Sequence, residues 1–491
     1  MNYPLRSTTL CYAFLGTWFR IEKFETAKMN NISQNGKAIF QKLIVELARS
    51  FNLWIKDRES FYQEIDKSNL AFNIINAPKD LESEIKTKTI NNEPCIQQLF
   101  HTLESQNLAR ELSIIIRKCC NLNCLTSELL PLINNTAYDY INSNINQFLE
   151  IISSNFLNQD FREESFKKIL NSRVSAFKKT FTSNLYQFPV IVFNLNKEVK
   201  LSNSIRLVPI DPLTLKSEEL RLLNETRLYK SNFFLEIFVK AKCSNKLSLQ
   251  LAEKSRDTTY NILKLLGTRI SPQAVPILTS NDRIKNPFHF YRYGPTTEEL
   301  FSAKTRNFPH FQFHSKYFWN EFEQSHNKEG SLINISFNIV ELLLIPHFSN
   351  ERVVERFERA LLWYGDAVTE HIPFQQIQKL VSSLEALVNF HEENTTETFK
   401  RRITNLHITY RGINEEIREK AKQLYDARSK IVHGSSHNET FNFCIIEFCS
   451  ETLLRAIYFF STFGFDKTAS KKSLAKFLDE IPSMITPKET H

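Results

Sequence analysis

The stretch IQKLVSSLEALVNF, residues 377–390, shows the pattern that decides the fold of the C-terminal part of the chain. Its apolar residues recur three and four positions apart, which predicts an amphipathic helix. The same spacing continues on both sides and predicts further helices over 352–370, 396–407, 414–433 and 439–463. The last of these is apolar on most sides, as a buried helix is. We therefore expect residues 346–491 to form one helical domain.

The sequence preceding this domain shows two different patterns, one β-rich and one helical. Residues 184–345 hold β-rich runs and one helical stretch at 251–267, which predicts a small central β-rich or α+β domain. The expected strands are 190–195, 204–210, 233–243, 274–279 and 288–293. Residues 1–183 are mostly helical in pattern, with apolar spacing over 38–49, 95–116 and 137–156. The fold class predicted for the whole chain is mainly α and multidomain.

Composition excludes several classes of enzyme. Only 9 of the 491 residues are glycine, and no two lie within a short motif. A phosphate-binding Walker loop, a dinucleotide-binding turn and a hydrolase nucleophile elbow each need at least two glycines close together. The formal net charge of +8 permits a polyanionic partner. The 8 cysteines form no regular framework and no apolar run reaches membrane-spanning length, so we expect reduced thiols, a cytoplasmic location and no membrane partner.

The segment LYDARSKIVHG, residues 424–434, carries the candidate chemistry. Arg428 and His433 stand in it with four residues between them, directly before Gly434. The same spacing occurs at Arg402–His407, so spacing alone does not choose between the two pairs. Position favours Arg428–His433, because it lies at the last turn of a predicted helix. Residues five apart on a helix point about 140° apart, so these two side chains converge only if the helix ends at His433 or if two subunits pool their motifs.

Residues 350–465 resemble the Apea-like branch of the HEPN superfamily. The resemblance rests on LEAL at 384–387, FKRRI at 399–403 and, most specifically, the segment 424–434. It implies a bundle of four to five helices that dimerises and cuts RNA without a metal ion, with one Arg–x4–His motif from each subunit. Such proteins often act as toxins in abortive infection against phage. Some HEPN toxins carry a modified Tyr two residues after the His, and this chain has Ser435 there.

RNA chemistry suits these residue types. The 2′-hydroxyl of RNA is its own nucleophile, and a His near neutral pH can accept or return the proton. We expect His433 to act as general acid or base and Arg428 to stabilise the charged pentacoordinate phosphate. Supporting roles fall to Ser429, beside the phosphate or Arg428, and to Glu385, pairing with Arg428. Three cations are candidate RNA contacts: Lys430, Arg401 and Arg402. We expect no metal ion and no cofactor.

The prediction is thus a metal-independent endoribonuclease that leaves 2′,3′-cyclic phosphate ends and acts as a homodimer or a higher even oligomer. Residues 1–345 would keep it inactive until a trigger, for instance one derived from phage, is sensed. The RNA target stays open; tRNA is one candidate, since toxin nucleases exploit its exposed, essential loop. The first alternative is a non-catalytic HEPN module that binds RNA, nucleotide or protein. The second is a helical scaffold in which the motif is incidental.

Overall fold

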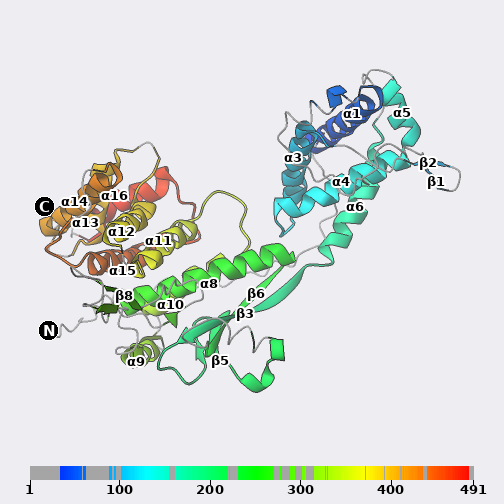
Figure 1. Ribbon diagram of the computed structural model, residues 1–491. Helices are drawn as coiled ribbons and strands as arrows, with labels where there is room; N and C mark the ends of the chain where they lie inside the picture. The colour runs from blue at the N-terminus through cyan, green and yellow to red at the C-terminus, as the bar shows by residue number, and fades with distance from the viewer. Residues whose placement is uncertain are drawn as a thin grey trace. The chain divides into compact units, whose positions relative to one another are not determined.

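The computed structural model describes the greater part of the chain. The described residues are 34–57, 59–61, 63, 88–90, 93–95, 101–153, 161–218, 221, 231–269, 277–278, 288–292, 301–305, 315–326, 328, 330–370, 372–391, 393–409, 412, 414–434 and 439–485. The chain divides into two compact units, Met1–Lys179 and Thr180–His491. Each unit has its own core and is described by itself (Figure 1).

The first unit is helical. Its elements are α1 (Gln34–Lys56), β1 (Lys88–Ile90), β2 (Glu93–Cys95), α3 (Leu103–Cys119), α4 (Thr126–Ser143), α5 (Ile145–Ser153) and α6 (Glu163–Lys178). Helices α1, α3, α4 and α6 pack around apolar side chains. Phe40 is fully buried and stacks on Phe166 with 4.0 Å between the ring centroids. The predicted helix over 137–156 is divided between α4 and α5, with Asn144 as the C-cap of α4.

The second unit begins with an antiparallel sheet of five strands. In chain order these are β3 (Thr182–Val192), β4 (Val199–Lys200), β5 (Ile205–Pro209), β6 (Phe233–Cys243) and β7 (Ile277–Leu278). Their order across the sheet is β4-β5-β6-β3-β7, so the long strands β3 and β6 lie side by side in the middle. A separate hairpin pairs β8 (Phe288–Arg292) with β9 (Phe301–Thr305). A single turn of 3-10 helix, Pro212–Thr214, follows β5.

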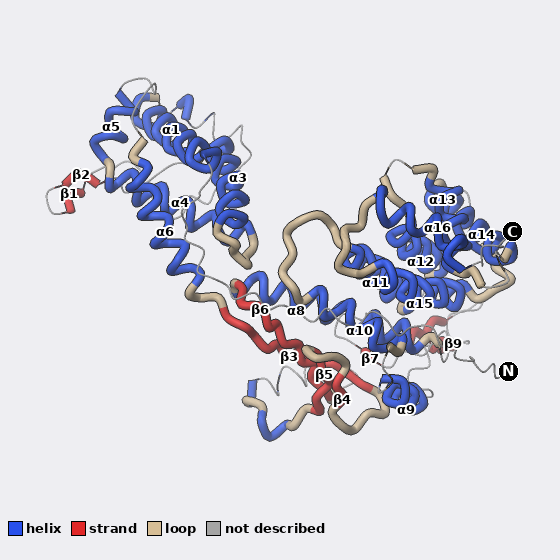
Figure 2. Tube along the Cα trace, turned by 180° about the vertical axis from the view of Figure 1, so that it is seen from behind, coloured by secondary structure: helices blue, strands red, loops and turns tan. Residues whose placement is uncertain are grey.

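Helix α8 (Asn245–Gly267) joins the sheet to the helices that follow. It packs against β6 and β3 on one side and against α10 and α11 on another (Figure 2). The crossing with α11 is close: a Cβ atom added at Gly365 would lie 1.8 Å from Asn261 Oδ1. A larger residue at that position would force the Asn261 side chain to move, and glycine lets the two helices approach without such a shift. The sheet and the helical bundle share packed surfaces within the second unit.

The bundle contains the residues of the predicted site. Its helices are α9 (Ser315–His326), α10 (Leu332–Leu343), α11 (Val353–Val368), α12 (Pro373–Val388), α13 (Thr395–Leu406), α14 (Glu415–Val432), α15 (Ile445–Phe463) and α16 (Lys476–Ile485), with a π-helical turn at Lys471–Ala475 before the last. Fully buried side chains from five helices form the core, namely Phe357, Leu384, Phe399, Leu424 and Phe460. Helix α12 contacts α11, α13, α14 and α15, and is therefore central to the bundle.

The mainly helical class and the small antiparallel sheet are confirmed. The five helices predicted over 352–463 are all present within a few residues of the expected bounds, and so is α8. Strand β3 begins at Thr182, well before the expected start at 190. The sequence did not predict this first half because its side chains alternate between exposed and half-buried and form no continuous apolar run. The expected boundary near 183 lies beside the division between the units, whereas the one at 345 falls inside the second unit.

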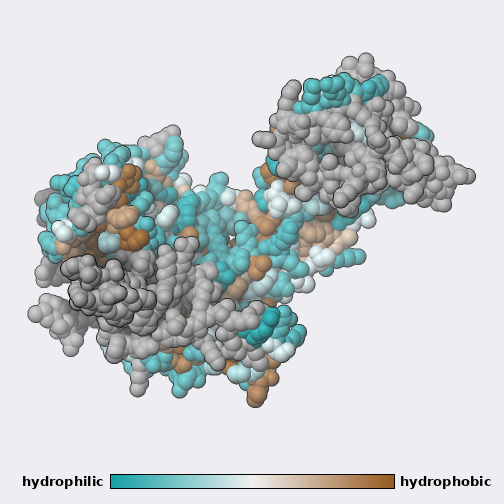
Figure 3. Space-filling view, in the orientation of Figure 1, coloured by the Kyte–Doolittle hydropathy of each residue, from teal (hydrophilic) through white to brown (hydrophobic). Residues whose placement is uncertain are grey.

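The described surface carries both hydrophilic and apolar residues. On the face shown in Figure 3, hydrophilic residues cover much of the described surface, with smaller hydrophobic patches among them. Among the described helices, none has both the length and the apolar character needed to cross a lipid bilayer.

Candidate functional site

The end of α14 places Arg428 and His433. The helix starts at the N-cap Asn414, whose side chain accepts a hydrogen bond from the Glu416 amide, and runs to Val432. His433 caps it with near-helical dihedral angles, φ −86° and ψ 4°, and its amide donates to the Ser429 carbonyl at 3.0 Å. Gly434 then adopts φ +72°, a left-handed conformation that favours glycine and ends the helix.

Arg428 projects from the inner side of α14. It follows the buried residues Ala421, Leu424 and Tyr425 at helical spacing. Its Nη2 lies 3.7 Å from Glu385 Oε2 on α12, which is an ion pair beyond hydrogen-bond range. Its Nε is shielded from solvent and has no hydrogen-bond partner among the described residues. About a third of the side chain, 30%, remains exposed. The guanidinium is therefore held near one carboxylate and still has donors to offer.

His433 lies at the same helix end but faces a different direction. Its side chain is exposed, and within the described residues it makes no hydrogen bond or ion pair. Because the backbone stays near-helical up to His433, the two side chains keep the angular separation of about 140° set by the helix. No contact between Arg428 and His433 is present in the described chain. One chain thus presents the two groups as neighbours on opposite sides of a helix end.

The supporting residues lie around this end. Glu385 lies beside Arg428, a contact that the sequence suggested but left open. Burial raises the pKa of Glu385, while the charge of Arg428 and a hydrogen bond from Tyr425 oppose that rise. Ser429 is half-buried, and its backbone carbonyl accepts the hydrogen bond from the His433 amide at the helix end. Lys430 is exposed and forms an ion pair with Glu439 at 3.4 Å.

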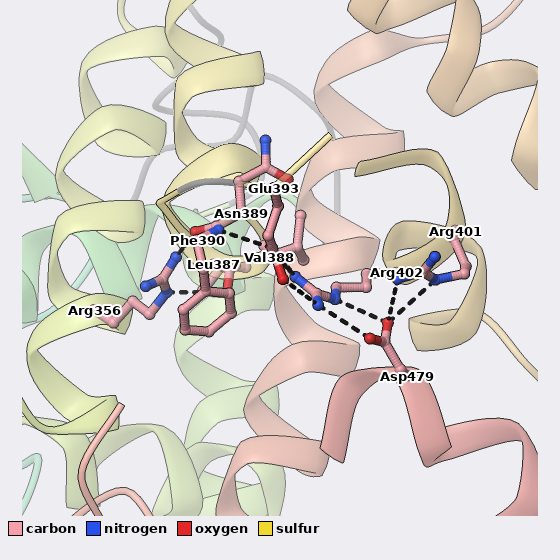
Figure 4. A network of polar contacts seen from close by, with 9 residues as sticks. All are labelled: Arg356, Leu387, Val388, Asn389, Phe390, Glu393, Arg401, Arg402 and Asp479. Carbon is pink, nitrogen blue, oxygen red and sulfur yellow. Dashed lines mark hydrogen bonds and ion pairs between the residues drawn. The ribbon is translucent and has the colours of Figure 1, made fainter. Parts of the chain in front are cut away.

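The second Arg–x4–His pair has a different environment. The Arg402 side chain is 1% exposed and all three of its nitrogen atoms donate hydrogen bonds (Figure 4). Its acceptors are Glu393 on the loop before α13, Asp479 on α16 and the Val388 carbonyl at the end of α12. Both carboxylates have a pKa held below the ordinary value; burial works against this shift, and the hydrogen bonds from Arg402 outweigh it. Arg402 therefore ties three parts of the bundle together.

His407 is enclosed as well. It is 4% exposed, stacks on Phe448, and its Nε2 lies 2.7 Å from Thr452 Oγ1. The Thr452 hydroxyl donates its single proton to the Phe448 carbonyl at 2.8 Å. Burial lowers the pKa of His407 to about 4, so the ring stays neutral near pH 7. This pair has no capacity left for a substrate.

These environments revise the set of RNA contacts. The prediction that Arg402 contacts RNA is wrong for the described conformation, because its guanidinium is buried and fully hydrogen-bonded. Arg401 is half-exposed, and its guanidinium is paired with Asp479 at 2.9 Å. Lys430 is the most accessible of the three candidates. The sequence pattern did not single out Tyr425, although its position three residues before Arg428 places both on one helix face.

The expectations for Ser435 and for a metal ion concern residues that the structure describes only in part. Ser435, two residues after His433, lies outside the described residues. Within the residues that are described, no group of three or more His, Cys, Asp or Glu side chains is arranged to hold a metal ion.

Comparisons with protein-family models, with curated proteins and with solved structures find no match for this chain.

Proposed function

We propose that the bundle is a HEPN-type endoribonuclease domain and that the end of α14 is its catalytic element. One observation carries the proposal: Arg428 keeps unused guanidinium donors at a helix end where His433 is exposed and unpartnered among the described residues. Leaving a buried donor unpaired costs about 1–3 kcal/mol. An anionic ligand that accepts from Arg428 removes this cost.

The chemistry uses the two side chains for different steps. His433 accepts the proton of the ribose 2′-hydroxyl or returns a proton to the departing 5′-oxygen. The 2′-oxygen attacks the adjacent phosphorus, the bond to the 5′-oxygen breaks, and the product carries a 2′,3′-cyclic phosphate. Arg428 donates to the phosphoryl oxygens, whose negative charge grows in the transition state. Neither step requires a metal ion or an organic cofactor.

A second copy of the chain completes the proposed site. A single copy directs Arg428 and His433 to different sides of one helix end, and each cleavage needs both an acid and a base. Two motifs that face each other supply two histidines and two arginines. We therefore propose a homodimer or a higher even oligomer. The proposed partner is RNA, with tRNA as one candidate.

The proposed biological role is that of a toxin-like effector in anti-phage defence, acting in the cytoplasm and silent until triggered. The central α+β part packs directly on the bundle through α8 and α10. The unit Met1–Lys179 has a core of its own. It is therefore the part we assign to sensing the trigger, and constitutive toxicity of the intact protein at low expression would contradict this assignment.

The direct test is cleavage of RNA in EDTA. Full-length protein and the His433→Ala variant are incubated with total RNA, and the product ends are analysed. The proposal predicts cutting by the unsubstituted protein alone, with 2′,3′-cyclic phosphate ends. Product ends with a 3′-hydroxyl, or equal cutting by the variant, would contradict it.

Absence of cutting is also informative. The fragment 346–491 lacks the packing surface that α8 supplies, so latency is better tested with the fragment Thr180–His491, which corresponds to one compact unit. If this fragment is folded and binds RNA in a salt-sensitive way without cutting it, the non-catalytic binding module replaces the nuclease. A monomer without RNA affinity would indicate a structural scaffold.

A further inference from the structure

Four aromatic side chains gather on the surface where α15 ends and α16 begins. Tyr458 is 60% exposed, and its ring meets the ring of Phe459 edge to face with 5.6 Å between the centroids. Phe463 lies one turn further along α15, on the same side of the helix as Phe459. It packs on Phe477 of α16 with 5.0 Å between the centroids. We call these four residues the aromatic surface; the three phenylalanines in it are half-buried.

Two exposed lysines accompany the aromatic surface. Lys467 Nζ lies over the Phe463 ring, 5.1 Å from its centroid. Lys472 lies in the π-helical turn that leads into α16. Both are exposed, and neither forms an ion pair with another of the described residues. Lys476, in contrast, faces Glu480 with 3.7 Å between Nζ and Oε1, so its ammonium group is engaged.

The charge of this segment favours an anionic partner. Residues 466–476 hold four lysines and one acidic residue, Asp466. Asp479, which follows on α16, is already paired with Arg401 and Arg402, so its charge is compensated. Rings and ammonium groups side by side suit an unpaired nucleic-acid strand, because each base has a flat face that stacks on a ring and each phosphate has a charge that a lysine neutralises. A duplex turns its base faces inward and offers the rings nothing to stack on.

The aromatic surface lies at the same end of the bundle as Arg428. The first amide of α11 donates a hydrogen bond of 2.8 Å to the Lys467 carbonyl. The first turn of α11 is joined to the last turn of α12, because Arg356 Nε donates to the Leu387 carbonyl at 3.2 Å. Glu385, which faces Arg428, belongs to that same turn of α12. A strand held on the aromatic surface is therefore at the end of the bundle that carries the candidate site.

We propose that the aromatic surface, together with Lys467 and Lys472, binds an unpaired strand of RNA. Bases stack on the exposed rings, on Tyr458 above all, and phosphates contact the two lysines. This chemistry suits any unpaired nucleic-acid strand, and the choice of RNA rests on the proposed function. The half-buried phenylalanines present faces for stacking and do not project far enough to insert into a lipid bilayer.

The first test measures binding without cleavage. The probe is a fluorescent 2′-O-methyl oligouridylate of about 12 nucleotides, which lacks the 2′-hydroxyl nucleophile and is not consumed. Fluorescence anisotropy with the full-length protein at one fixed salt concentration gives the dissociation constant. Tyr458→Ala should raise it about tenfold, because one base loses its stacking partner, whereas Tyr458→Trp should preserve it. The matched control is Tyr317→Ala on α9, at a tyrosine that is 57% exposed, which should leave the constant unchanged.

Other probes decide what the surface binds. Equal affinities in Tyr458→Ala and Tyr317→Ala would overturn the proposal, and so would a duplex RNA bound as tightly as the single strand. A DNA strand of matching sequence that is bound more tightly than the RNA would overturn the choice of RNA. Binding to phosphatidylserine vesicles that Tyr458→Ala abolishes, with RNA affinity unchanged, would show a membrane surface instead.

A second test concerns the phosphate contacts. Lys472→Gln should reduce the slope of log binding constant against log salt by about 1. Lys476→Gln is the matched control and should leave the slope unchanged, because the Lys476 ammonium group is engaged by Glu480. Equal slopes in the two variants would remove Lys472 from the proposed surface.

These measurements keep the two proposals apart. If Tyr458→Ala weakens binding while neither the full-length protein nor the fragment Thr180–His491 cuts RNA, the nuclease proposal fails and the RNA surface stands. If the protein cuts RNA and Tyr458→Ala binds as tightly as Tyr317→Ala, the RNA surface fails and the nuclease proposal stands.

Discussion

Two Arg–x4–His pairs lie in one bundle and differ in what their side chains have left to bind. Arg402 is buried and all its nitrogen atoms are hydrogen-bonded, and His407 is a neutral ring enclosed next to Thr452. Arg428 has a shielded Nε without a partner, and His433 is exposed. With the same spacing, the Arg402–His407 pair stabilises the bundle, whereas the Arg428–His433 pair keeps side-chain groups that can bind a ligand. The difference shows that remaining hydrogen-bonding capacity, more than spacing, distinguishes a candidate site.

The physical cause is the location of each pair on its helix. Arg402 lies in the interior of the bundle, where an unpaired charge is so costly that two carboxylates and a carbonyl gather around it. Arg428 lies just before the last turn of α14, where the following residues Lys430, Val432 and His433 are exposed. Substitutions can test whether the Arg402–His407 pair contributes mainly to stability and the Arg428–His433 pair mainly to activity.

The largest expected effect is on the catalytic side. Arg428→Ala should lower RNA cleavage by roughly 10²–10³-fold, because a donor to the developing phosphoryl charge is lost. The free energy of unfolding should change by less than about 1 kcal/mol, since the ion pair with Glu385 is long and partly exposed. Cleavage assays and urea unfolding on the same preparation measure both. A large stability loss with intact cleavage would reverse the assignment of the two pairs.

The second effect is on stability. Arg402→Met should lower the free energy of unfolding by about 3–5 kcal/mol, because it leaves Glu393 without its cation, Asp479 with the exposed Arg401 alone and the Val388 carbonyl without its donor. Arg401→Met is the matched control: it removes the exposed partner of the same Asp479 and should cost less than about 1 kcal/mol. Equal losses of unfolding free energy in the two variants would contradict the proposal that Arg402 holds three parts of the bundle together.

A third, smaller effect concerns pH. The pKa of His407 is about 4 in the folded protein and near 6.5 when unfolded. Between these values acid protonates the unfolded chain only, so stability is lost as pH falls from about 6.5 towards 4, by on the order of 2–3 kcal/mol. Unfolding curves at several pH values should show a shallower loss in His407→Gln. An identical pH slope in both proteins would contradict a buried, neutral His407.

The smallest effect is expected at Lys430. Lys430→Gln should reduce the slope of log binding constant against log salt by about 1, uniformly across RNA sequences, if its exposed ammonium contacts a phosphate. Lys476→Gln on α16 serves as a control with a similarly exposed lysine. Titrations of RNA binding at several salt concentrations measure the slopes, and equal slopes for both variants would remove Lys430 from the RNA surface.

Much of the fold followed from apolar spacing. Helices α8 and α11 to α15 were predictable because each buries one clear stripe, as Phe357, Leu361 and Leu384 illustrate. The first half of β3 was not, because an exposed strand such as that around Leu185 carries no strong burial pattern. The boundary expected at 345 was placed where the sequence pattern changes from β-rich to helical. Such a pattern carries no information on the packing of α8 against α11.

The candidate site was predictable in part for a similar reason. Glu385 was a candidate partner of Arg428, but the sequence alone left open whether the two side chains meet, and the structure places them 3.7 Å apart. The burial of Arg402 could not be foreseen, because its partners Glu393 and Asp479 come from separate parts of the chain. An Arg within a helix is exposed more often than buried, and only three-dimensional contacts show the exception.

The most direct test of the proposed two-chain site is a mixing experiment. Arg428→Ala and His433→Ala variants, each inactive alone on this account, are unfolded and refolded together so that mixed oligomers form. We predict that RNA cleavage in EDTA returns above the level of either variant refolded alone but stays below that of the unsubstituted protein, with 2′,3′-cyclic phosphate ends, since the mixed dimer holds one arginine and one histidine where the complete site holds two of each. Mixed oligomers that form and still do not cut, while the unsubstituted protein refolded in the same way does, would contradict a site shared between two copies.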